Sequence, residues 1–555
     1  MTTPADQLRI ALAQLNPIVG DIAGNVEKVK AAHAQAAEAG ADLVVFSELF
    51  IPGYPPEDLV LKPAFAAASR DAVEQLAKDL GSGPGVLVGA IWPEGNDVYN
   101  AVAFLDAGEV KAVRYKSDLP NYGVFDEKRV FAAGPLPSPI DFRGIRIGVP
   151  ICEDIWNEDV CECLAECGAE FLVVPNGSPF DWKKPDVRTN IAVARVSENK
   201  LPLAYVNQLG GQDELVFDGA SFVLNADASL AVQMPAWRED ILITEWTRDG
   251  DQWSCAAGQR AVLETEEASA YQACVLGLKD YVDKNGFPGV VLGLSGGIDS
   301  ALVAAIAVDA LGADRVHCIM LPYRYTSEES IADAAGCAEA LGVKYDTIAI
   351  SEPVEGFMSA LADMFHGQNS GVAEENIQSR TRGSILMAVS NKFGSMVVTT
   401  GNKSEMSVGY ATLYGDMNGG FNPIKDLYKT EVYRVAAWRN GQVPDGALGP
   451  AGIVIPENIL TKAPTAELRE GQTDQDSLPP YDVLDDILTC LVEEELPLTD
   501  IAARGHDKDV VRRISRLLNI AEYKRRQAAP GVKISSRNFG RDRRYPITNR
   551  FQEPL

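Results

Sequence analysis

The stretch VVLGLSGGIDSALVAAIAV, residues 290–308, constrains the fold of this chain more than any other. An apolar strand runs directly into glycines and then into a helix, an arrangement that aims backbone N–H groups at an anion. The familiar nucleotide loop GxxxxGK[ST] ends in a lysine that reaches the β- and γ-phosphates, and no lysine follows here. We therefore expect a phosphate-binding loop of a different design.

Composition narrows the class of protein. A chain of 555 residues is too long for one hydrophobic core, so we expect roughly two to four domains. The net charge of −28 argues against partners such as nucleic acid or an anionic membrane, and no apolar run is long enough to span a bilayer. Nine scattered cysteines and no export signal predict reduced thiols in the cytoplasm.

The two halves of the chain differ in the order of their predicted elements. Up to residue 246, many short apolar strands occur with alanine-rich helical stretches, which indicates a sandwich of sheets and helices. From residue 265 onward, strands alternate with helices, which is typical of a doubly wound parallel sheet. We predict an α/β protein with domains at residues 1–246 and 265–555, joined by a polar linker at 247–264.

Histidine is too sparse to explain the chemistry. The four histidines are far apart in the sequence, and neither HExxH nor a Cys/His zinc spacing is present. No GxSxG motif marks a serine nucleophile, so catalysis by histidine is the less favoured alternative.

Glu48, Lys116 and Cys152 each follow a predicted strand in the first half. If these strands are parallel neighbours, the three side chains emerge on one rim. A lysine ammonium would favour the thiolate, and a carboxylate could accept its proton. Lys116 and the N–H of Glu153 would then hold the oxyanion that forms when the thiol attacks an amide. For each residue alone, packing or a solvated position is the alternative.

The segments FSELFIPGYPPEDL, YKSDLPNYGVFDEKRVF and GVPICEDIW resemble, in this order, the three active-site segments of the nitrilase superfamily. The resemblance implies an αββα sandwich with a catalytic triad of Glu48, Lys116 and Cys152. It also implies an acyl-enzyme intermediate and a supporting role for Glu127.

The SGGIDS loop resembles that of the N-type ATP pyrophosphatases, which hold pyrophosphate as a leaving group while attack falls on the α-phosphate. This resemblance accounts for the missing lysine. It implies the ATP-binding positions Gly293, Leu294, Ser295, Gly296, Gly297, Ile298, Asp299 and Ser300. Asp299 is suited to Mg²⁺.

The segments EENIQSRTRG, TTGNKSEMSVGYATLYGDMNGGFNPIKDLYKTEVY and EYKRRQAAPGVKISSRNFGRDRRYPI resemble the NAD synthetases. The whole chain resembles the glutamine-dependent NAD⁺ synthetase family. This resemblance implies that the first domain hydrolyses glutamine and that the second adenylates deamido-NAD⁺ with ATP. Ammonia then displaces AMP to give NAD⁺. Family resemblance also implies a homo-oligomer.

Carried over residue by residue, the family pattern assigns two further sets of ligand-binding positions. For deamido-NAD⁺ they are Asn376, Glu405 and Lys524, and for glutamine they are Tyr122, Ser178 and Lys184. The same pattern implies that Thr400 contacts ATP and that Glu405 is a second Mg²⁺ ligand beside Asp299. Between Tyr523 and Arg550, nine Lys and Arg residues accompany one acid. Such a basic segment either closes over dinucleotide phosphates or forms a solvated tail or subunit contact.

Three other functions stay open at this stage. The first is another ATP-pyrophosphatase amidotransferase with a different acceptor, although such enzymes use a different glutaminase. The second is a tRNA thiolase, which usually needs a CxxC pair that the second half lacks. The third is a nucleotide-sensing scaffold without activity, which the full set of reactive side chains disfavours.

Overall fold

The computed structural model describes residues 6–555, which form two compact units. One unit comprises the described residues up to Gln212 together with Val216–Glu264, and the other comprises Asp213–Leu215 and Thr265–Leu555. In the described part of the chain, no helix has the length and apolarity needed to cross a membrane. All nine cysteines are free thiols.

The N-terminal unit is built on two large β-sheets. The first has the strand order β15-β14-β1-β2-β3-β4-β5 and the second the order β13-β12-β9-β8-β7-β6. The first sheet consists of β1 (Gln7–Gln14), β2 (Leu43–Val45), β3 (Gly85–Glu94), β4 (Asp97–Asp106), β5 (Glu109–Tyr115), β14 (Asp240–Asp249) and β15 (Gln252–Cys255). The second consists of β6 (Ile140–Phe142), β7 (Ile145–Gly148), β8 (Phe171–Asn176), β9 (Leu203–Asn207), β12 (Phe222–Leu224) and β13 (Leu230–Gln233). The strands β10 (Leu209–Gln212) and β11 (Leu215–Asp218) form a separate pair.

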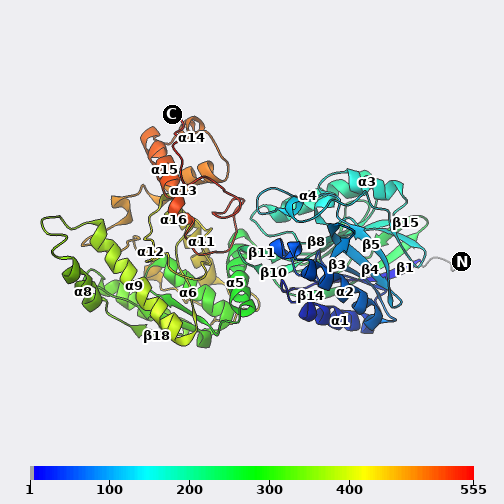
Figure 1. The fold of residues 1–555 in the computed structure, drawn as a ribbon, viewed down its shortest axis with the longest axis horizontal. Helices are drawn as coiled ribbons and strands as arrows, with labels where there is room; N and C mark the ends of the chain where they lie inside the picture. The colour runs from blue at the N-terminus through cyan, green and yellow to red at the C-terminus, as the bar shows by residue number, and fades with distance from the viewer. Residues whose placement is uncertain (1–5) are drawn as a thin grey trace. The chain divides into compact units, whose positions relative to one another are not determined.

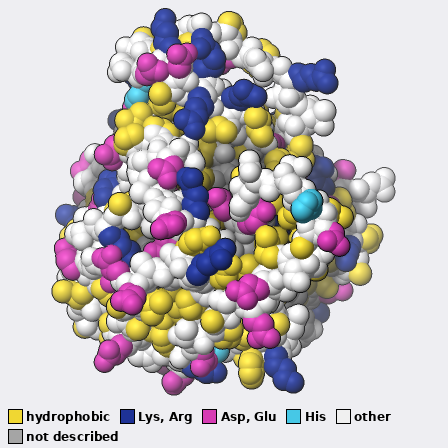
Figure 2. Space-filling view, turned by 90° about the vertical axis from the view of Figure 1, so that its left-hand side faces the viewer, with side chains coloured by type: hydrophobic (Ala, Val, Ile, Leu, Met, Phe, Trp, Pro, Cys, Tyr) yellow, Lys and Arg dark blue, Asp and Glu magenta, His cyan; other side chains and the backbone are white. Residues whose placement is uncertain are grey.

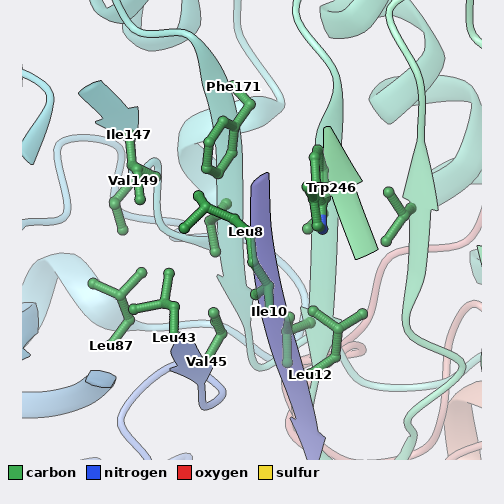
Figure 3. Packing of buried hydrophobic residues seen from close by; sticks show 14 of the residues in the cluster. Leu8, Ile10, Leu12, Leu43, Val45, Leu87, Ile147, Val149, Phe171 and Trp246 are labelled. Atoms are coloured by element: carbon green, nitrogen blue, oxygen red, sulfur yellow. The ribbon is translucent and has the colours of Figure 1, made fainter. Parts of the chain in front are cut away.

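Alternation along the strands explains the layers of this unit. In β1, Leu8, Ile10 and Leu12 point into the core between the two sheets, which Figure 3 shows, whereas Ala11 and Ala13 face a second core. Helices α1 (Ile22–Glu38) and α2 (Pro63–Leu80) cover that second core. Helices α3 (Asp159–Glu166) and α4 (Lys184–Asn199) cover the outer face of the other sheet. The layers run from α1 and α2 to α3 and α4 (Figure 1), which confirms the predicted αββα sandwich.

The predicted linker at 247–264 begins too early. Residues up to Cys255 belong to the first sheet, because β14 turns back into β15 through Gly250, whose φ is +62°. Trp246 and Trp253 are both buried in the core between the sheets, and this burial holds the hairpin in place. The polar turn between the strands conceals the continuing sheet in the sequence.

The C-terminal unit has a four-stranded parallel sheet of order β18-β17-β16-β19. Its strands are β16 (Val290–Gly293), β17 (Val316–Met320), β18 (Lys344–Thr347) and β19 (Met396–Val397). The helices around it are α5 (Glu266–Lys284), α6 (Ile298–Leu311), α7 (Glu328–Leu341), α8 (Ser351–Leu361), α9 (Val372–Phe393), α10 (Lys403–Val408), α11 (Lys429–Gly441) and α12 (Glu457–Thr461). A helical lobe follows, with α13 (Tyr481–Val492), α14 (Leu498–Ala503), α15 (Lys508–Ile520) and α16 (Glu522–Arg525).

Helices cover both faces of this sheet. Helix α6 is buried around nearly its whole circumference, because it packs against β17 and also against α5 and α11. Side chains of α8 and α9 join Val291 and Ile319 of the sheet in a separate core. The prediction of a doubly wound parallel sheet is therefore confirmed, and the SGGIDS loop lies between β16 and α6.

Candidate active sites

A lysine lies between two carboxylates in the N-terminal unit. The Nζ atom of Lys116, just after β5, is 2.7 Å from Oε1 of Glu48 and 2.9 Å from Oε2 of Glu127. The hydroxyl of Tyr54 also donates to Glu127, at 3.0 Å. Lys116 and Glu48 are fully buried, so each charge depends on its partner for compensation. Three of the four predicted catalytic side chains are thus in direct contact.

Backbone and amide groups fix the orientation of Glu48. Its Oε1 atom accepts a hydrogen bond from Asn100 Nδ2 at 2.7 Å, and its Oε2 atom accepts one from the N–H of Gly177 at 2.9 Å. The turn that carries Glu48 passes very close to β3. A Cβ atom on Gly89 would lie 2.1 Å from the backbone nitrogen of Leu49, so glycine at this position makes room for the turn.

Cys152 follows β7 and begins the short 3₁₀ helix η3 (Cys152–Ile155). Its φ of +47° is a left-handed conformation that is rare for a residue with a side chain. The buried Asp154 holds this turn, because its Oδ2 atom accepts the N–H of Ile151 at 2.9 Å. Its Oδ1 atom accepts the N–H groups of the two residues after Lys116, at 2.9 and 2.7 Å. One carboxylate therefore joins the turn of the cysteine to the loop of the lysine.

The strands that carry these residues do not meet the condition considered above, because they are not parallel neighbours. Glu48 and Lys116 follow β2 and β5, which have β3 and β4 between them in the first sheet. Cys152 follows β7 of the second sheet. The three side chains meet because the two sheets pack face to face.

Burial governs the protonation of this cluster. Burial and the charge of Glu48 raise the pKa of the Cys152 thiol well above its usual value, and Lys116 opposes them only in part. Burial disfavours the ammonium of Lys116, but Glu127 and Glu48 outweigh it and raise the pKa of the lysine. Burial raises the pKa of Glu127 to about 7. The resting thiol is therefore protonated: Lys116 lowers the thiol pKa, as expected, but burial and the charge of Glu48 outweigh it.

Two of the three residues predicted to recognise glutamine lie beside Cys152. The hydroxyl of Tyr122 donates to Oε1 of Glu153 at 3.0 Å, and both residues line a cavity of about 540 Å³. The Nζ atom of Lys184 lies 4.3 Å from the ring centroid of Trp156, and its charge acts on Cys152 and Glu153. Burial lowers the pKa of this lysine.

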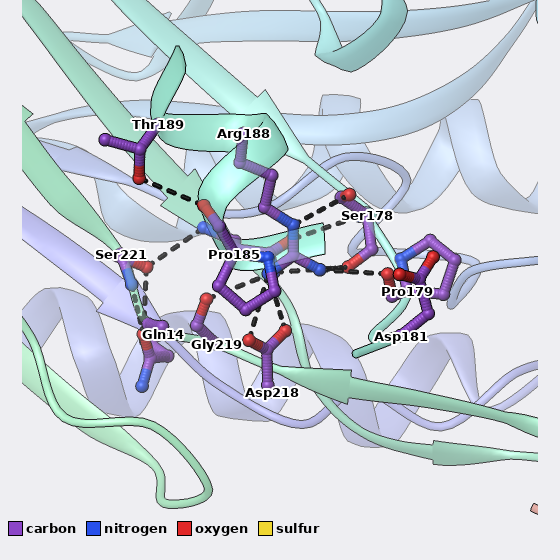
Figure 4. Close-up of polar contacts among 12 residues, drawn as sticks. Gln14, Ser178, Pro179, Asp181, Pro185, Arg188, Thr189, Asp218, Gly219 and Ser221 are labelled. Carbon is purple, nitrogen blue, oxygen red and sulfur yellow. Dashed lines mark hydrogen bonds and ion pairs between the residues drawn. The ribbon is translucent and has the colours of Figure 1, made fainter. Parts of the chain in front are cut away.

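The third residue, Ser178, is held by a buried arginine (Figure 4). The Nε atom of Arg188 donates to Oγ of Ser178 at 3.0 Å, and Nη2 donates to the carbonyls of Ser178 and Pro179 at 2.6 and 2.9 Å. The Nη1 atom reaches both carboxylate oxygens of Asp218, at 2.7 and 3.0 Å. Because Arg188 occupies an acceptor position of the Ser178 oxygen, the hydroxyl proton is directed toward another acceptor.

In the C-terminal unit, the SGGIDS loop adopts a conformation that requires glycine. Gly296 has φ +80°, and a Cβ atom there would lie 2.2 Å from the carbonyl oxygen of Ser330. The hydroxyl of Ser300 accepts the N–H of Ser295 at 3.2 Å and donates to the carbonyl of Gly297 at 3.0 Å. The loop borders a cavity of about 680 Å³ beyond the strand ends, where parallel sheets bind ligands.

This cavity gathers almost all of the predicted nucleotide-binding positions. Apart from Gly296, every predicted residue of the loop lines it, together with Thr400, Asn376, Glu405 and Lys524. The Nζ atom of Lys524 donates to the backbone carbonyls of residues 409 and 411, at 2.7 and 2.6 Å. Figure 2 shows one face of the C-terminal unit, where Lys and Arg side chains border a hollow.

A lysine lies between the two predicted metal ligands. The Nζ atom of Lys429, on α11, is 2.5 Å from Oδ2 of Asp299 and 3.3 Å from Oε1 of Glu405. Burial raises the pKa of Glu405 to about 8. Within residues 6–555, no three His, Cys, Asp or Glu side chains gather into a metal site. Two carboxylates around one cation nevertheless suit Mg²⁺ that arrives with phosphates, because phosphate oxygens and water supply its remaining ligands.

Comparison with known proteins identifies the family. A family model described as carbon-nitrogen hydrolase matches residues 9–253, and one described as NAD synthase matches residues 270–528. A glutamine-dependent NAD(+) synthetase of Rhodobacter capsulatus is 51% identical over 548 residues, which cover 99% of each chain. This chain belongs to the glutamine-dependent NAD⁺ synthetase family. A relative from Xanthomonas campestris pv. campestris is 46% identical over 559 residues, or 98% of each chain.

A solved structure agrees with this assignment along the whole chain. The glutamine-dependent NAD⁺ synthetase of Acinetobacter baumannii, solved in complex with adenosine diphosphate, is 43% identical. It matches with a TM-score of 0.78 over 98% of this chain and 99% of its own. The two units of this chain therefore follow one another in the same order as in that synthetase.

Two arginines of the basic segment at residues 523–550 pair with a carboxylate of the same chain in this member of the NAD⁺ synthetase family. Arg525 and Arg543 lie 2.7 and 2.9 Å from the same oxygen of Glu522. Of this segment, all of which the structure describes, Lys524 alone lines the cavity. The idea that the whole segment closes over dinucleotide phosphates is therefore supported for Lys524 only.

The residues that support the candidate catalytic groups of this NAD⁺ synthetase family member were not predicted from the sequence. Asp154 carries a recognisable signal, because an acidic residue in the first turn of a helix often accepts backbone N–H groups. Arg188 and Asp218 carry no such sequence signal, because they are 30 positions apart in the chain and pair only after folding.

Proposed function

We propose that the chain makes NAD⁺ with glutamine as the nitrogen donor. The N-terminal unit hydrolyses glutamine, and the C-terminal unit uses the ammonia to amidate deamido-NAD⁺ that ATP has activated. The observation that carries this proposal is the position of Lys116 between Glu48 and Glu127 beside Cys152, in one chain with the SGGIDS cavity. The name shared by the full-length relatives supports it.

Glutamine hydrolysis begins at the protonated thiol. Glu48 accepts the thiol proton while the sulfur of Cys152 attacks the carboxamide carbon. The ammonium of Lys116 and the N–H of Glu153 hold the oxyanion. Glu48 then gives its proton to the nitrogen, which leaves as ammonia and leaves a thioester. Water that loses a proton to Glu48 hydrolyses the thioester to glutamate and restores the thiol.

Three residues position glutamine for this attack. The Lys184 ammonium is suited to the α-carboxylate of the substrate, because charge-assisted hydrogen bonds are the stronger ones. The hydroxyl of Ser178, oriented by Arg188, and that of Tyr122 would add hydrogen bonds to the substrate. Glu127 contributes indirectly, since it shares the charge of Lys116 with Glu48.

The second reaction takes place at the SGGIDS loop, with Thr400 as a further ATP contact. The loop holds the β- and γ-phosphates of ATP, while a carboxylate oxygen of deamido-NAD⁺ attacks the α-phosphorus. Pyrophosphate leaves, and an acyl-adenylate forms. Ammonia attacks the acyl carbon and loses a proton, and AMP leaves with the electrons of the broken C–O bond. Asn376, Glu405 and Lys524 hold the dinucleotide.

Mg²⁺ is part of this proposal. Asp299 and Glu405 would hold it, and it supplies neutralisation of the phosphate charge. Lys429, which now bridges these carboxylates, would remain near the phosphates as a second positive charge. We also propose a homo-oligomer and a cytoplasmic location, the latter because nine free thiols suit a reducing compartment.

A coupled assay for NAD⁺ tests the function directly. Purified full-length protein receives ATP, Mg²⁺ and deamido-NAD⁺ with glutamine, with ammonium, or with neither. We expect NAD⁺ from both nitrogen sources and none without nitrogen. NAD⁺ from ammonium alone would contradict the roles of Glu48, Lys116 and Cys152. No NAD⁺ from either source would contradict deamido-NAD⁺ as the acceptor.

A further inference from the structure

One of the five basic side chains that line the cavity of the C-terminal unit lacks a strong partner. Three of them pair with carboxylates, namely Lys429, Lys462 and Arg469. Lys524 donates to two backbone carbonyls. Among residues 6–555, the side chain of Arg382 makes a single hydrogen bond, from Nε to the carbonyl of Leu321 at 3.0 Å, and no ion pair. Its two terminal NH₂ groups remain as donors for a ligand.

Arg382 is held next to the phosphate loop. Leu321 directly follows β17, the neighbour of β16 in the parallel sheet, and the N–H of Leu294 in the loop bonds to β17 at 3.0 Å. One turn further along α9, the side chain of Leu386 would lie 3.4 Å from a Cβ atom built on Gly293. The guanidinium therefore lies where the end of β17, helix α9 and the start of the SGGIDS loop come together.

The surroundings of Arg382 are unfavourable for a cation without an anion. Burial lowers the pKa of Arg382 to about 10, so the side chain still carries its charge at neutral pH. Glu467 and Asp416 act on this charge only through space and do not pair with it. A partly buried guanidinium without a carboxylate is costly in free energy, and a phosphate in the cavity would offset that cost. The planar fork of arginine matches two phosphate oxygens at once.

We infer that Arg382 binds the phosphates of ATP and remains in contact with pyrophosphate when it leaves. The inference rests on the proposed function for the identity of the ligand. The position beside Gly293 and Leu294 favours ATP over the dinucleotide, because the predicted dinucleotide contact Asn376 lies nearly two turns earlier on α9. Arg382 would then replace, from a different element, the lysine that the loop lacks.

A direct measurement of ATP binding tests the inferred role of Arg382. Calorimetry with Mg-ATP on the full chain compares the wild type with Arg382→Gln, Arg382→Lys and the control Arg512→Gln, an exposed arginine paired with Asp509. We expect ATP affinity to fall about 10- to 100-fold in Arg382→Gln, the usual worth of a hydrogen bond to a charged group. We expect a smaller fall in ATP affinity for Arg382→Lys and no change in ATP affinity for Arg512→Gln. With ammonium as nitrogen source, the KM for ATP rises and that for deamido-NAD⁺ does not.

Thermal unfolding of the ligand-free protein separates binding from folding. Since Arg382 has no ion-pair partner to lose, the midpoint of Arg382→Gln stays level or rises. Three results for Arg382→Gln would overturn the inference. They are an unchanged ATP affinity, a lower unfolding midpoint without ligand, and weaker binding of deamido-NAD⁺ with no change in ATP binding. A wild type that binds ATP but makes no NAD⁺ would instead contradict the proposed function, while the binding data still decide the role of Arg382.

Discussion

The N–H of Ser117 donates to Oδ1 of Asp154 at 2.9 Å, although the two residues are 37 positions apart. Ser117 directly follows Lys116, and Asp154 lies two residues after Cys152. The bond therefore fixes the distance between the lysine and the thiol without engaging either of them. Asp154 is a positioning residue. Its substitution would change the positions of Lys116 and Cys152 while leaving both reactive side chains in place.

Asp154→Asn should impair glutamine hydrolysis and spare the second reaction. An amide in place of the carboxylate points a donor at the backbone N–H groups, so the turn at Cys152 shifts. Because displacements of about 1 Å cost up to about 100-fold, we expect glutamine-dependent NAD⁺ synthesis to fall by roughly 10- to 100-fold. Ammonium-dependent synthesis serves as the control. Equal losses with both nitrogen sources would show a folding defect instead.

The same variant should reveal the titration of Asp154 in the stability of the protein. Burial raises the pKa of Asp154 from 3.8 to about 7. The folded state therefore holds this proton more tightly than the unfolded state, and the resulting stability is complete below about pH 4 and is lost as the pH rises through about 7. Urea unfolding at pH 5 and pH 8 should show that the destabilisation of Asp154→Asn relative to wild type shrinks at the higher pH. If the destabilisation caused by Asp154→Asn increased with pH, the predicted direction of this pH dependence would be contradicted.

Cys152→Ala should abolish synthesis from glutamine and retain synthesis from ammonium. The sulfur is the only atom of the side chain that bonds to substrate in our mechanism, and the C-terminal unit holds its own cavity. We expect a loss of at least about 1,000-fold with glutamine and less than about threefold with ammonium. The coupled NAD⁺ assay measures both. Failure of ammonium to support this variant would contradict the division of labour between the units.

Arg188→Lys should weaken glutamine binding more than turnover. Lysine keeps a positive charge beside Asp218 but cannot reach Ser178 and Asp218 together, so the serine hydroxyl loses its orientation. We expect the KM for glutamine to rise about tenfold. Arg188→Gln is the comparison, because it leaves Asp218 buried without a partner and should destabilise the protein by about 3–5 kcal/mol. A fall in kcat at an unchanged KM would exclude this role for Arg188.

Gly89→Ala should distort the glutaminase site, because Gly89 on β3 packs against the turn that carries Glu48. The new Cβ atom would lie 2.1 Å from the nitrogen of Leu49, so the backbone after Glu48 must move. We expect a loss of more than about 3 kcal/mol in unfolding free energy and weak synthesis from glutamine. Gly356 in α8 is a matched control, since a Cβ there meets nothing within 4 Å. Gly356→Ala should stabilise the protein by about 0.5–1 kcal/mol. Equal effects of the two substitutions would contradict this account.

The sequence predicted both folds, because these depend on local patterns, and among the candidate catalytic residues it named Glu48, Lys116 and Glu127, whose side chains are in contact in the structure. The alternation in β1 and the strand-glycine-helix order at residues 290–308 are visible without a structure. The arrangement of Glu48, Lys116 and Cys152 is not visible in the sequence, because Glu48 and Lys116 come from one sheet and Cys152 from the other. No local rule shows that two sheets will pack these strand ends together. The protonation of the thiol also depends on burial, which single residues do not reveal.

The protonated state of Cys152 has a consequence for the durability of the enzyme. The buried thiol becomes nucleophilic only when Glu48 takes its proton, and in our mechanism this happens as a bound amide is attacked. Cys167, at the end of α3, is exposed on the surface. Because Cys167 is exposed and Cys152 is buried, we expect oxidants and alkylating agents to modify Cys167 first. The burial that keeps the resting thiol protonated should thus also slow its chemical inactivation between turnovers.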